Sequence, residues 1–128
     1  KIYLSDPKGS CLYSYIKTKE FKSEGNSITE GIGSSRVTKN FEKALIDDAY
    51  SIDDTMALTV LFDLIEKEGL SLGTSSGINV AGAIKLAQEL GPNKTIVTIL
   101  CDKSDRYQGK LFNKKFLIEK NLPYPRWL

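Results

Sequence analysis

The sequence predicts an α/β fold in which a mainly parallel sheet carries helices on its faces. Two segments, residues 53–69 and 76–90, have the apolar spacing of amphipathic helices. Residues 95–100 form a β-branched apolar run that is typical of a buried strand. Strand-like and helical segments alternate along the chain, which favours parallel strands joined by helices. With 128 residues, 41% of them hydrophobic, the chain is long enough for one domain with its own core.

The N-terminal third predicts a strand, a helix and a long loop. Residues 2–4 (IYL) are expected to form a short buried strand that ends at residues 5–7 (SDP). Residues 9–18 have a helical pattern. Residues 24–36 are rich in Gly and Ser, and we interpret them as an ordered loop. Loops of this length inside a compact domain are often functional.

The pattern most typical of a helix occurs at residues 53–69, which follow a brief apolar stretch at residues 49–52. Asp53 is a suitable N-cap, because its carboxylate can accept a free backbone N–H at the positive end of a helix. Gly69 predicts the end of this helix in a left-handed conformation. The side chains expected on its buried face are Ala57, Leu58, Leu61, Leu64 and Ile65.

Residues 70–72 predict a short strand that leads into the turn at residues 73–77 (GTSSG). The helix at residues 76–90 is expected to end at the Gly91-Pro92 pair. The side chains expected on its buried face are Val80, Ala83, Ile84 and Ala87. Residues 121–128 contain two prolines, which favours an extended arm that packs Trp127 against the domain.

Composition excludes several classes of function. The net charge of +2 is too small to predict electrostatic binding to nucleic acid or to a membrane surface. No apolar stretch approaches the roughly 18 to 20 residues that span a bilayer. Cys11 and Cys101 are too few for a disulfide framework and lack metal-site spacing, which favours a reducing, cytoplasmic compartment. The chain begins inside a strand-like run without Met, so we expect an upstream segment.

The turn at residues 73–77 is the strongest candidate for a functional site. It lies where a strand meets a helix, the usual ligand position in open α/β sheets. Gly73 and Gly77 are expected to let the backbone turn sharply and approach a ligand. The hydroxyls of Ser75 and Ser76 lie next to the free N–H groups of a helix start. A tight turn with a serine cap and no ligand is the alternative.

Residues 73–77 also match G-x-S-x-G, the nucleophile elbow of α/β-hydrolases, with Ser75 as nucleophile. That chemistry needs a histidine base after the serine, and the chain contains no histidine. Without histidine, and with two distant cysteines, no metal site is expected. The pairs Asp47-Asp48 and Asp53-Asp54 are better explained by solvent exposure and by a helix start than by acid–base catalysis.

Longer stretches resemble a known family, the cysteine synthases (O-acetylserine sulfhydrylases). Residues 70–90 (LSLGTSSGINVAGAIKLAQEL) resemble a block near the C-terminus of these enzymes. Residues 95–112 (TIVTILCDKSDRYQGKLF) are similar to the strand and loop that follow it, and residues 28–38 (ITEGIGSSRVT) to an upstream Gly-Ile-Gly loop. Residues 50–68 match the strand and helix between them. The resemblance covers nearly the whole chain in order.

The resemblance implies the tryptophan-synthase-β-like fold, which is fold type II among enzymes that use pyridoxal 5′-phosphate (PLP). Residues 1–128 would be the C-terminal part of the large, PLP-binding α/β domain. In the family, the first serine of the S-S-G motif hydrogen-bonds the pyridine nitrogen of PLP, a role that carries over to Ser75. Gly31, Ile32 and Gly33 match a loop that lines the cavity beside the cofactor. Ser76 and Asp102 are weaker candidates, and Cys101-Asp102 stands where the family often has Pro-Ser.

The implied reaction is β-replacement, in which sulfide replaces the acetate of O-acetylserine to give L-cysteine, and the implied assembly is a homodimer. The family's Schiff-base lysine, phosphate cup and substrate loop have no match in the chain. Lys8, Lys85 and Lys103 do not occur in that lysine's context. We therefore expect the chain alone to be inactive. A cystathionine β-synthase, a serine/threonine ammonia-lyase and a non-catalytic binding module remain as alternatives.

Overall fold

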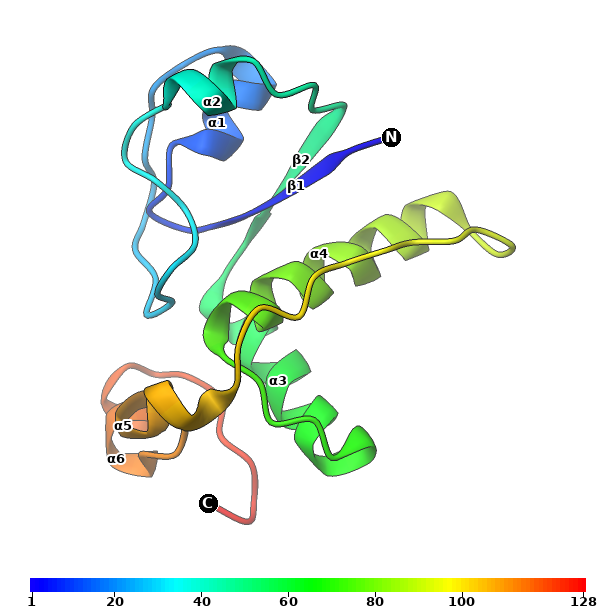
Figure 1. The fold of residues 1–128 in the computed structure, drawn as a ribbon. Coiled ribbons are helices and arrows are strands. Elements are labelled where there is room, and N and C mark those ends of the chain that lie inside the picture. Colours follow the sequence, from blue (N-terminus) through cyan, green and yellow to red (C-terminus); the bar gives the residue numbers. More distant parts are fainter.

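A computed structural model describes all 128 residues. Its elements are β1 (Tyr3–Pro7), α1 (Leu12–Thr18), α2 (Lys39–Glu42), β2 (Asp48–Ile52), α3 (Asp54–Glu68), α4 (Thr74–Leu90), the 3₁₀ helix η1 (Ser104–Tyr107), α5 (Gln108–Leu111) and α6 (Lys114–Glu119). The α/β class is confirmed (Figure 1). The first strand is longer than predicted, since it continues through Pro7, and the following helix starts later, at Leu12.

The sheet consists of β1 and β2, which are parallel and in register from Tyr3–Asp48 to Pro7–Ile52. Neighbouring residues of β1 contact helices on opposite faces, as the pleat of a strand requires. Ser5 packs against Gly82 of α4, whereas the carboxylate of Asp6 accepts the N–H of Tyr13 in α1 at 2.8 Å. The prediction of a parallel sheet between helices is therefore confirmed, although the sheet has only two strands.

Helix α3 forms as its sequence predicts. The Asp53 carboxylate caps it by accepting the N–H of Met56 at 2.8 Å, and Gly69 ends it with φ +67°. Ala57, Leu58 and Leu61 are buried. On one side α3 packs against α4, and its apolar face also carries the main core cluster of the chain.

Helix α4 buries a different face from the one predicted. Ile84 and Ala87 are exposed, and the buried side chains are instead Ile78, Ala81 and Leu86. The helix has apolar residues around most of its circumference, so spacing alone does not choose a face. The two glycines inside it mark the observed face: a Cβ at Gly77 would lie 2.8 Å from the Ala57 carbonyl oxygen, and one at Gly82 would overlap Ser5.

The prediction of a strand at residues 95–100 is wrong for this chain. The segment runs alongside α4, yet its backbone N–H groups donate to no other part of the protein. Val97 is 87% exposed and Ile99 70% exposed. A strand forms only against a partner, and a groove separates this segment from β1. Residues 70–72 are likewise not a strand beyond one antiparallel bridge between Leu72 and Lys103.

The C-terminal residues close the far side of α3. Tyr107, Leu111 and Leu117 are buried against it. The arm after α6 packs Trp127 edge-on against Phe62, and the indole N–H donates to Glu66 at 2.8 Å, as the arm prediction requires. None of the helices has the length and apolar character needed to cross a bilayer.

Candidate cofactor site

Ser75 lies in the first turn of α4, immediately after the N-cap Gly73 and Thr74. It is only 6% exposed. Its hydroxyl makes no hydrogen bond within the chain, although the hydroxyls of neighbouring residues do. The 17-residue helix behind it directs free N–H groups and the positive end of its dipole to this place. Ser75 can therefore offer one hydrogen bond to a ligand.

The glycines of the motif, Gly73 and Gly77, have ordinary backbone conformations and lie in tight contacts. Gly73 has φ −75° and Gly77 is helical, so neither needs the left-handed region. Both are required for close packing against the protein. A Cβ on Gly73 would lie 2.1 Å from Oδ1 of Asp102 and 2.6 Å from the ring of Tyr107, and Gly77 lies directly against α3.

Asp102 lies behind the start of α4. Its carbonyl oxygen accepts the N–H of Gly73 at 2.9 Å, and its Oδ2 accepts the Tyr107 hydroxyl at 2.7 Å. This hydrogen bond, together with burial, raises the pKa of the Tyr107 phenol. Oδ1 of Asp102 is buried and has no partner. The structure thus brings a carboxylate with unused hydrogen-bonding capacity to the backbone beside Ser75.

Ser76 has a structural partner. It is fully buried, and its hydroxyl oxygen accepts the N–H of Cys101 at 3.0 Å. The bond joins the first turn of α4 to the end of the 95–100 segment. Because Ser76 is fully buried and its hydroxyl supports this structural contact, we do not assign it to a ligand.

The Gly-Ile-Gly loop reaches the same end of α4. The N–H of Glu30 donates to the Thr74 hydroxyl at 3.3 Å, and Ile32 packs on the core cluster around Ile78. Gly31 and Gly33 have φ of +73° and +81°, which L side chains rarely adopt. The loop and the S-S-G motif, more than forty residues apart in sequence, are therefore neighbours.

Three residues that hold this loop escaped the sequence analysis. Asp54 accepts the N–H of Ile28 at 2.8 Å and the hydroxyl of Ser27. Lys110 donates to the Ile28 carbonyl at 2.9 Å and pairs with Glu30. Thr74 holds the loop from α4. Only Asp54 and Thr74 carried a signal, since both lie next to residues already singled out at helix starts.

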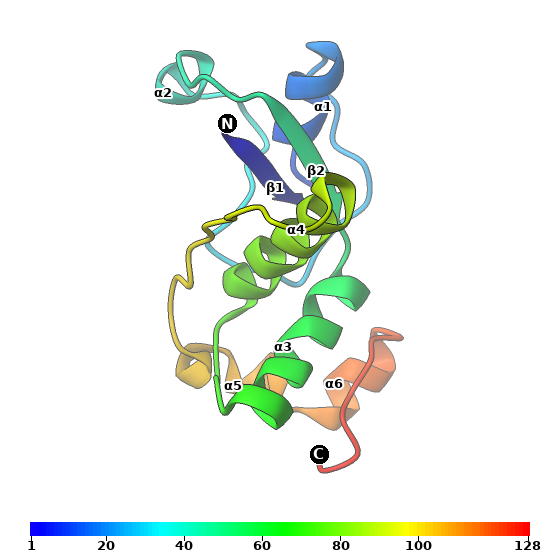
Figure 2. The same ribbon diagram turned by 90° about the vertical axis from the view of Figure 1, so that its right-hand side faces the viewer.

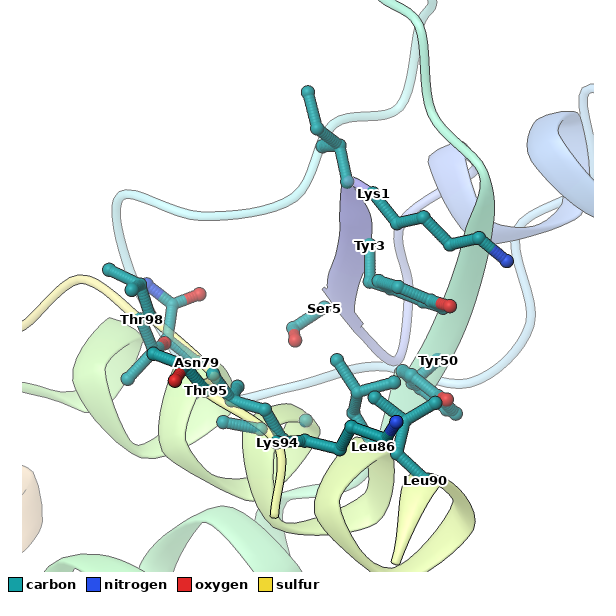
Figure 3. Close-up of a pocket in the computed structure, with 15 residues that line it drawn as sticks. Lys1, Tyr3, Ser5, Tyr50, Asn79, Leu86, Leu90, Lys94, Thr95 and Thr98 are labelled. Atoms are coloured by element: carbon teal, nitrogen blue, oxygen red, sulfur yellow. The ribbon is translucent and has the colours of Figure 1, made fainter.

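Lys8 and Lys85 make their contacts away from the start of α4. The Lys85 amine is 3.4 Å from the Ser51 carbonyl oxygen, and Lys8 lines a polar groove with Gly33. Neither contacts Ser75. A groove of about 590 Å³ lies between β1 and residues 94–98 (Figure 3), and none of the predicted cofactor residues lines it. Nowhere in the chain do three or more His, Cys, Asp or Glu side chains come together as metal ligands would.

Comparison with known proteins decides the family. The model of the pyridoxal-phosphate dependent enzymes matches residues 1–102. The chain belongs to this family. Cysteine synthase 1 of Neurospora crassa is 42% identical over 126 residues, and cysteine synthase 1 of Emericella nidulans is 41% identical over the same length. Each match covers 95% of this chain and 34% of the relative.

A solved structure supports the same conclusion. The crystal structure of an O-acetylserine dependent cystathionine β-synthase from Helicobacter pylori matches 86% of the chain with a TM-score of 0.75 and 32% identity. That match also covers 34% of the solved chain. The fold is therefore that of part of a fold type II PLP enzyme. The chain spans about one third of the length of its relatives.

Proposed function

We propose that this chain is the C-terminal part of the large domain of a PLP-dependent cysteine synthase, whose complete form replaces the acetate of O-acetylserine with sulfide. The observation that carries the proposal is the 42% identity to a cysteine synthase across 95% of the chain. The geometry agrees with one cofactor contact. Ser75 is shielded, positioned by a helix start and free to hydrogen-bond a ring nitrogen.

The choice of serine has a chemical consequence. When bound, PLP withdraws electrons from the α-carbon of an amino acid so that its proton can be removed. The Ser75 hydroxyl would donate to an unprotonated ring nitrogen. A hydroxyl cannot keep that nitrogen protonated as a carboxylate would, which suits loss of a β-substituent. The start of α4 and the loop at residues 31–33 would form one wall of the site.

The cofactor role of Ser75 can be tested in a chimaera. This chain would replace the matching 34% of N. crassa cysteine synthase 1. We expect the chimaera to retain PLP with its visible absorbance. The Ser75→Ala variant should change that absorbance spectrum and weaken retention, whereas Ser14→Ala, on α1 and without a side-chain hydrogen bond, should change neither. A Ser75→Ala spectrum identical to that of the parent chimaera would contradict the proposal.

The reaction itself needs the natural polypeptide. The coding sequence before Lys1 should encode an S-x-K lysine and a glycine-rich phosphate cup, and the complete protein should form cysteine from O-acetylserine and sulfide. The chain alone should neither retain PLP nor form cysteine. An in-frame stop codon followed by a new start would favour a non-catalytic module.

The second candidate is a cystathionine β-synthase that uses O-acetylserine, favoured by the H. pylori structure. Both reactions replace the same acetate and differ in the sulfur nucleophile that attacks, which is sulfide in one and the thiol of homocysteine in the other. Competition between sulfide and homocysteine in the complete protein therefore separates them.

A further inference from the structure

One short segment, residues 104–111, contacts both walls of the candidate cofactor site. It consists of η1 and α5 and lies beyond residues 1–102, to which the family model matches, so that match assigns it no role. The ring of Tyr107 lies beside the wall that the start of α4 forms. Lys110 reaches the other wall, the loop at residues 28–33.

The segment is itself firmly attached to the rest of the chain. The hydroxyls of Ser71 and Ser104 form a hydrogen bond at 2.6 Å, and the N–H of Ser104 donates to the Ser71 carbonyl oxygen at 3.3 Å. Tyr107 and Leu111 are buried in the core cluster on α3. Lys110 stands between these two buried residues, so its side chain extends from a fixed piece of backbone.

The Lys110 amine holds two points of the loop at once. It donates to the Ile28 carbonyl oxygen at 2.9 Å and forms an ion pair with the Glu30 carboxylate. An ammonium group has three N–H donors, so it can make both bonds together. The two contacts lie on either side of Thr29, directly before the Gly-Ile-Gly sequence at residues 31–33. The ammonium group thereby restricts where that sequence can lie.

Ile28 and Glu30 also attach the loop to the two long helices. The N–H of Ile28 donates to Asp54 of α3 at 2.8 Å, and its side chain packs against the core cluster. The N–H of Glu30 donates to the Thr74 hydroxyl at the start of α4 at 3.3 Å. The helices hold N–H groups of the loop, whereas Lys110 holds a carbonyl group and a carboxylate that have no other hydrogen-bond partner in the chain.

Lys110 differs from a lysine in an ordinary surface ion pair. Its side chain is 32% exposed, and its carbonyl partner lies 82 residues away in the sequence. The side chain of Lys115, by contrast, is 88% exposed, and its nitrogen is 4.0 Å from Glu119, four residues along the same helix. Exposed pairs of the second kind contribute little to stability. Lys110 instead joins α5 to a distant loop.

We propose that Lys110 is a positioning residue of the cofactor site, which fixes the loop at residues 28–33 so that the backbone of residues 31–33 forms its wall of the site. Through Tyr107 and Lys110, the segment at residues 104–111 then holds both walls in place. The effect on the cofactor rests on the function proposed above, whereas the effect on the loop does not.

Amide exchange in the 128-residue chain tests the position of the loop without any cofactor. The N–H groups of Ile28 and Glu30 report it, because they bond to α3 and α4 only while the loop is in place. We expect Lys110→Met to speed exchange at both by about tenfold. Lys110→Arg keeps the charge and the N–H donors and should stay within about twofold of the parent chain.

Lys115→Met is the matched control and should leave both exchange rates unchanged, since its ion pair does not involve the loop. Unchanged exchange in Lys110→Met would overturn the proposal. So would a Lys110→Arg chain that exchanges as fast as Lys110→Met, because the charge and the N–H donors would then have no role.

The chimaera with N. crassa cysteine synthase 1 tests the consequence for the cofactor. Titration of the cofactor-free chimaera with PLP should give a Kd about tenfold higher for Lys110→Met, as expected when one charge-assisted hydrogen bond is lost. Lys110→Arg and Lys115→Met should keep the parent Kd. An unchanged Kd in Lys110→Met would overturn the positioning role at the cofactor site. A parent chimaera that does not retain PLP would contradict the proposed function, and the exchange rates would still decide whether Lys110 positions the loop.

Discussion

The two ends of the molecule differ in how far the chain completes its own packing. Around α3, the helices η1, α5 and α6 and the arm with Trp127 enclose a core cluster, which we name the closed region. β1 and residues 94–100 border a groove, which we name the open region. Figure 2 shows α3, α5 and α6 gathered at one end and β1 and β2 at the other. α4 contacts both regions.

The difference shows that composition and burial are separate properties. Residues 95–100 are among the most strand-like in the chain, yet three of their apolar side chains are exposed. In the closed region, less regular sequence is buried because partners are present. Apolar burial stabilises a fold only where the chain supplies the second surface.

The largest expected effect is that of Ile78→Ala in α4. Ile78 is fully buried in the cluster with Ile52, Ala57 and Ala81. Truncation removes transfer free energy and leaves a cavity, so we expect a loss of about 2 to 5 kcal/mol in the free energy of unfolding. Urea denaturation followed by circular dichroism measures it. A loss below about 1 kcal/mol would mean that the core around α4 is loosely packed.

The second largest loss of stability is expected where the start of α4 packs against Asp102 and Tyr107. Gly73→Ala places a Cβ against Asp102 and Tyr107, and we expect a loss of about 1 to 3 kcal/mol. The loss should be smaller when Asp102→Ala is already present, because the nearest clashing atom is gone. Gly109→Ala is the matched control, since its Cβ would meet no atom within 4 Å. Equal losses for Gly73→Ala and Gly109→Ala would refute the contact.

Asp6, in β1, should make stability depend on pH. Desolvation by burial raises its pKa, and Oδ1 has no partner. Above the ordinary carboxyl pKa of 3.8, the unfolded chain releases this proton while the folded chain keeps it, so stability falls as pH rises towards the raised pKa. The slope contributed by one proton cannot exceed about 1.4 kcal/mol per pH unit. Asp6→Asn should remove this contribution, so that the free energy of unfolding falls less steeply as pH rises above 3.8.

The pKa of Asp48 is shifted in the opposite direction to that of Asp6, so Asp48 serves as an internal control. Its pKa is lowered, first by Lys17 and then by the N–H of Ala49, so its contribution is lost as pH falls below 3.8. Asp6→Asn should leave this acid limb intact. Thermal unfolding of the parent chain and of the Asp6→Asn variant at a series of acid pH values measures the pH dependence above and below 3.8. An unchanged slope above pH 3.8 in the variant would contradict the role of Asp6.

The features that could be predicted from the sequence are those that depend on residues close together in the chain. The caps of α3 were predictable because Asp53 and Gly69 act on their own backbone. The family was predictable from continuous motifs, and the same motifs lead to the proposal for Ser75. The buried face of α4 was not, because Gly77 and Gly82 select it through contacts with distant residues. The loop partners of Asp54 and Lys110 could not be predicted either, since they lie 26 and 82 residues away, although the position of Asp54 at a helix start was a signal.

The smallest effect is expected for Ile99→Ala, the counterpart of Ile78→Ala in the open region. Ile99 is 70% exposed, so its truncation in this chain should change the free energy of unfolding by no more than about 0.5 kcal/mol. Urea denaturation of both isoleucine variants measures the two losses and so compares the two regions directly. A loss for Ile99→Ala as large as that for Ile78→Ala would contradict the exposure of residues 95–100.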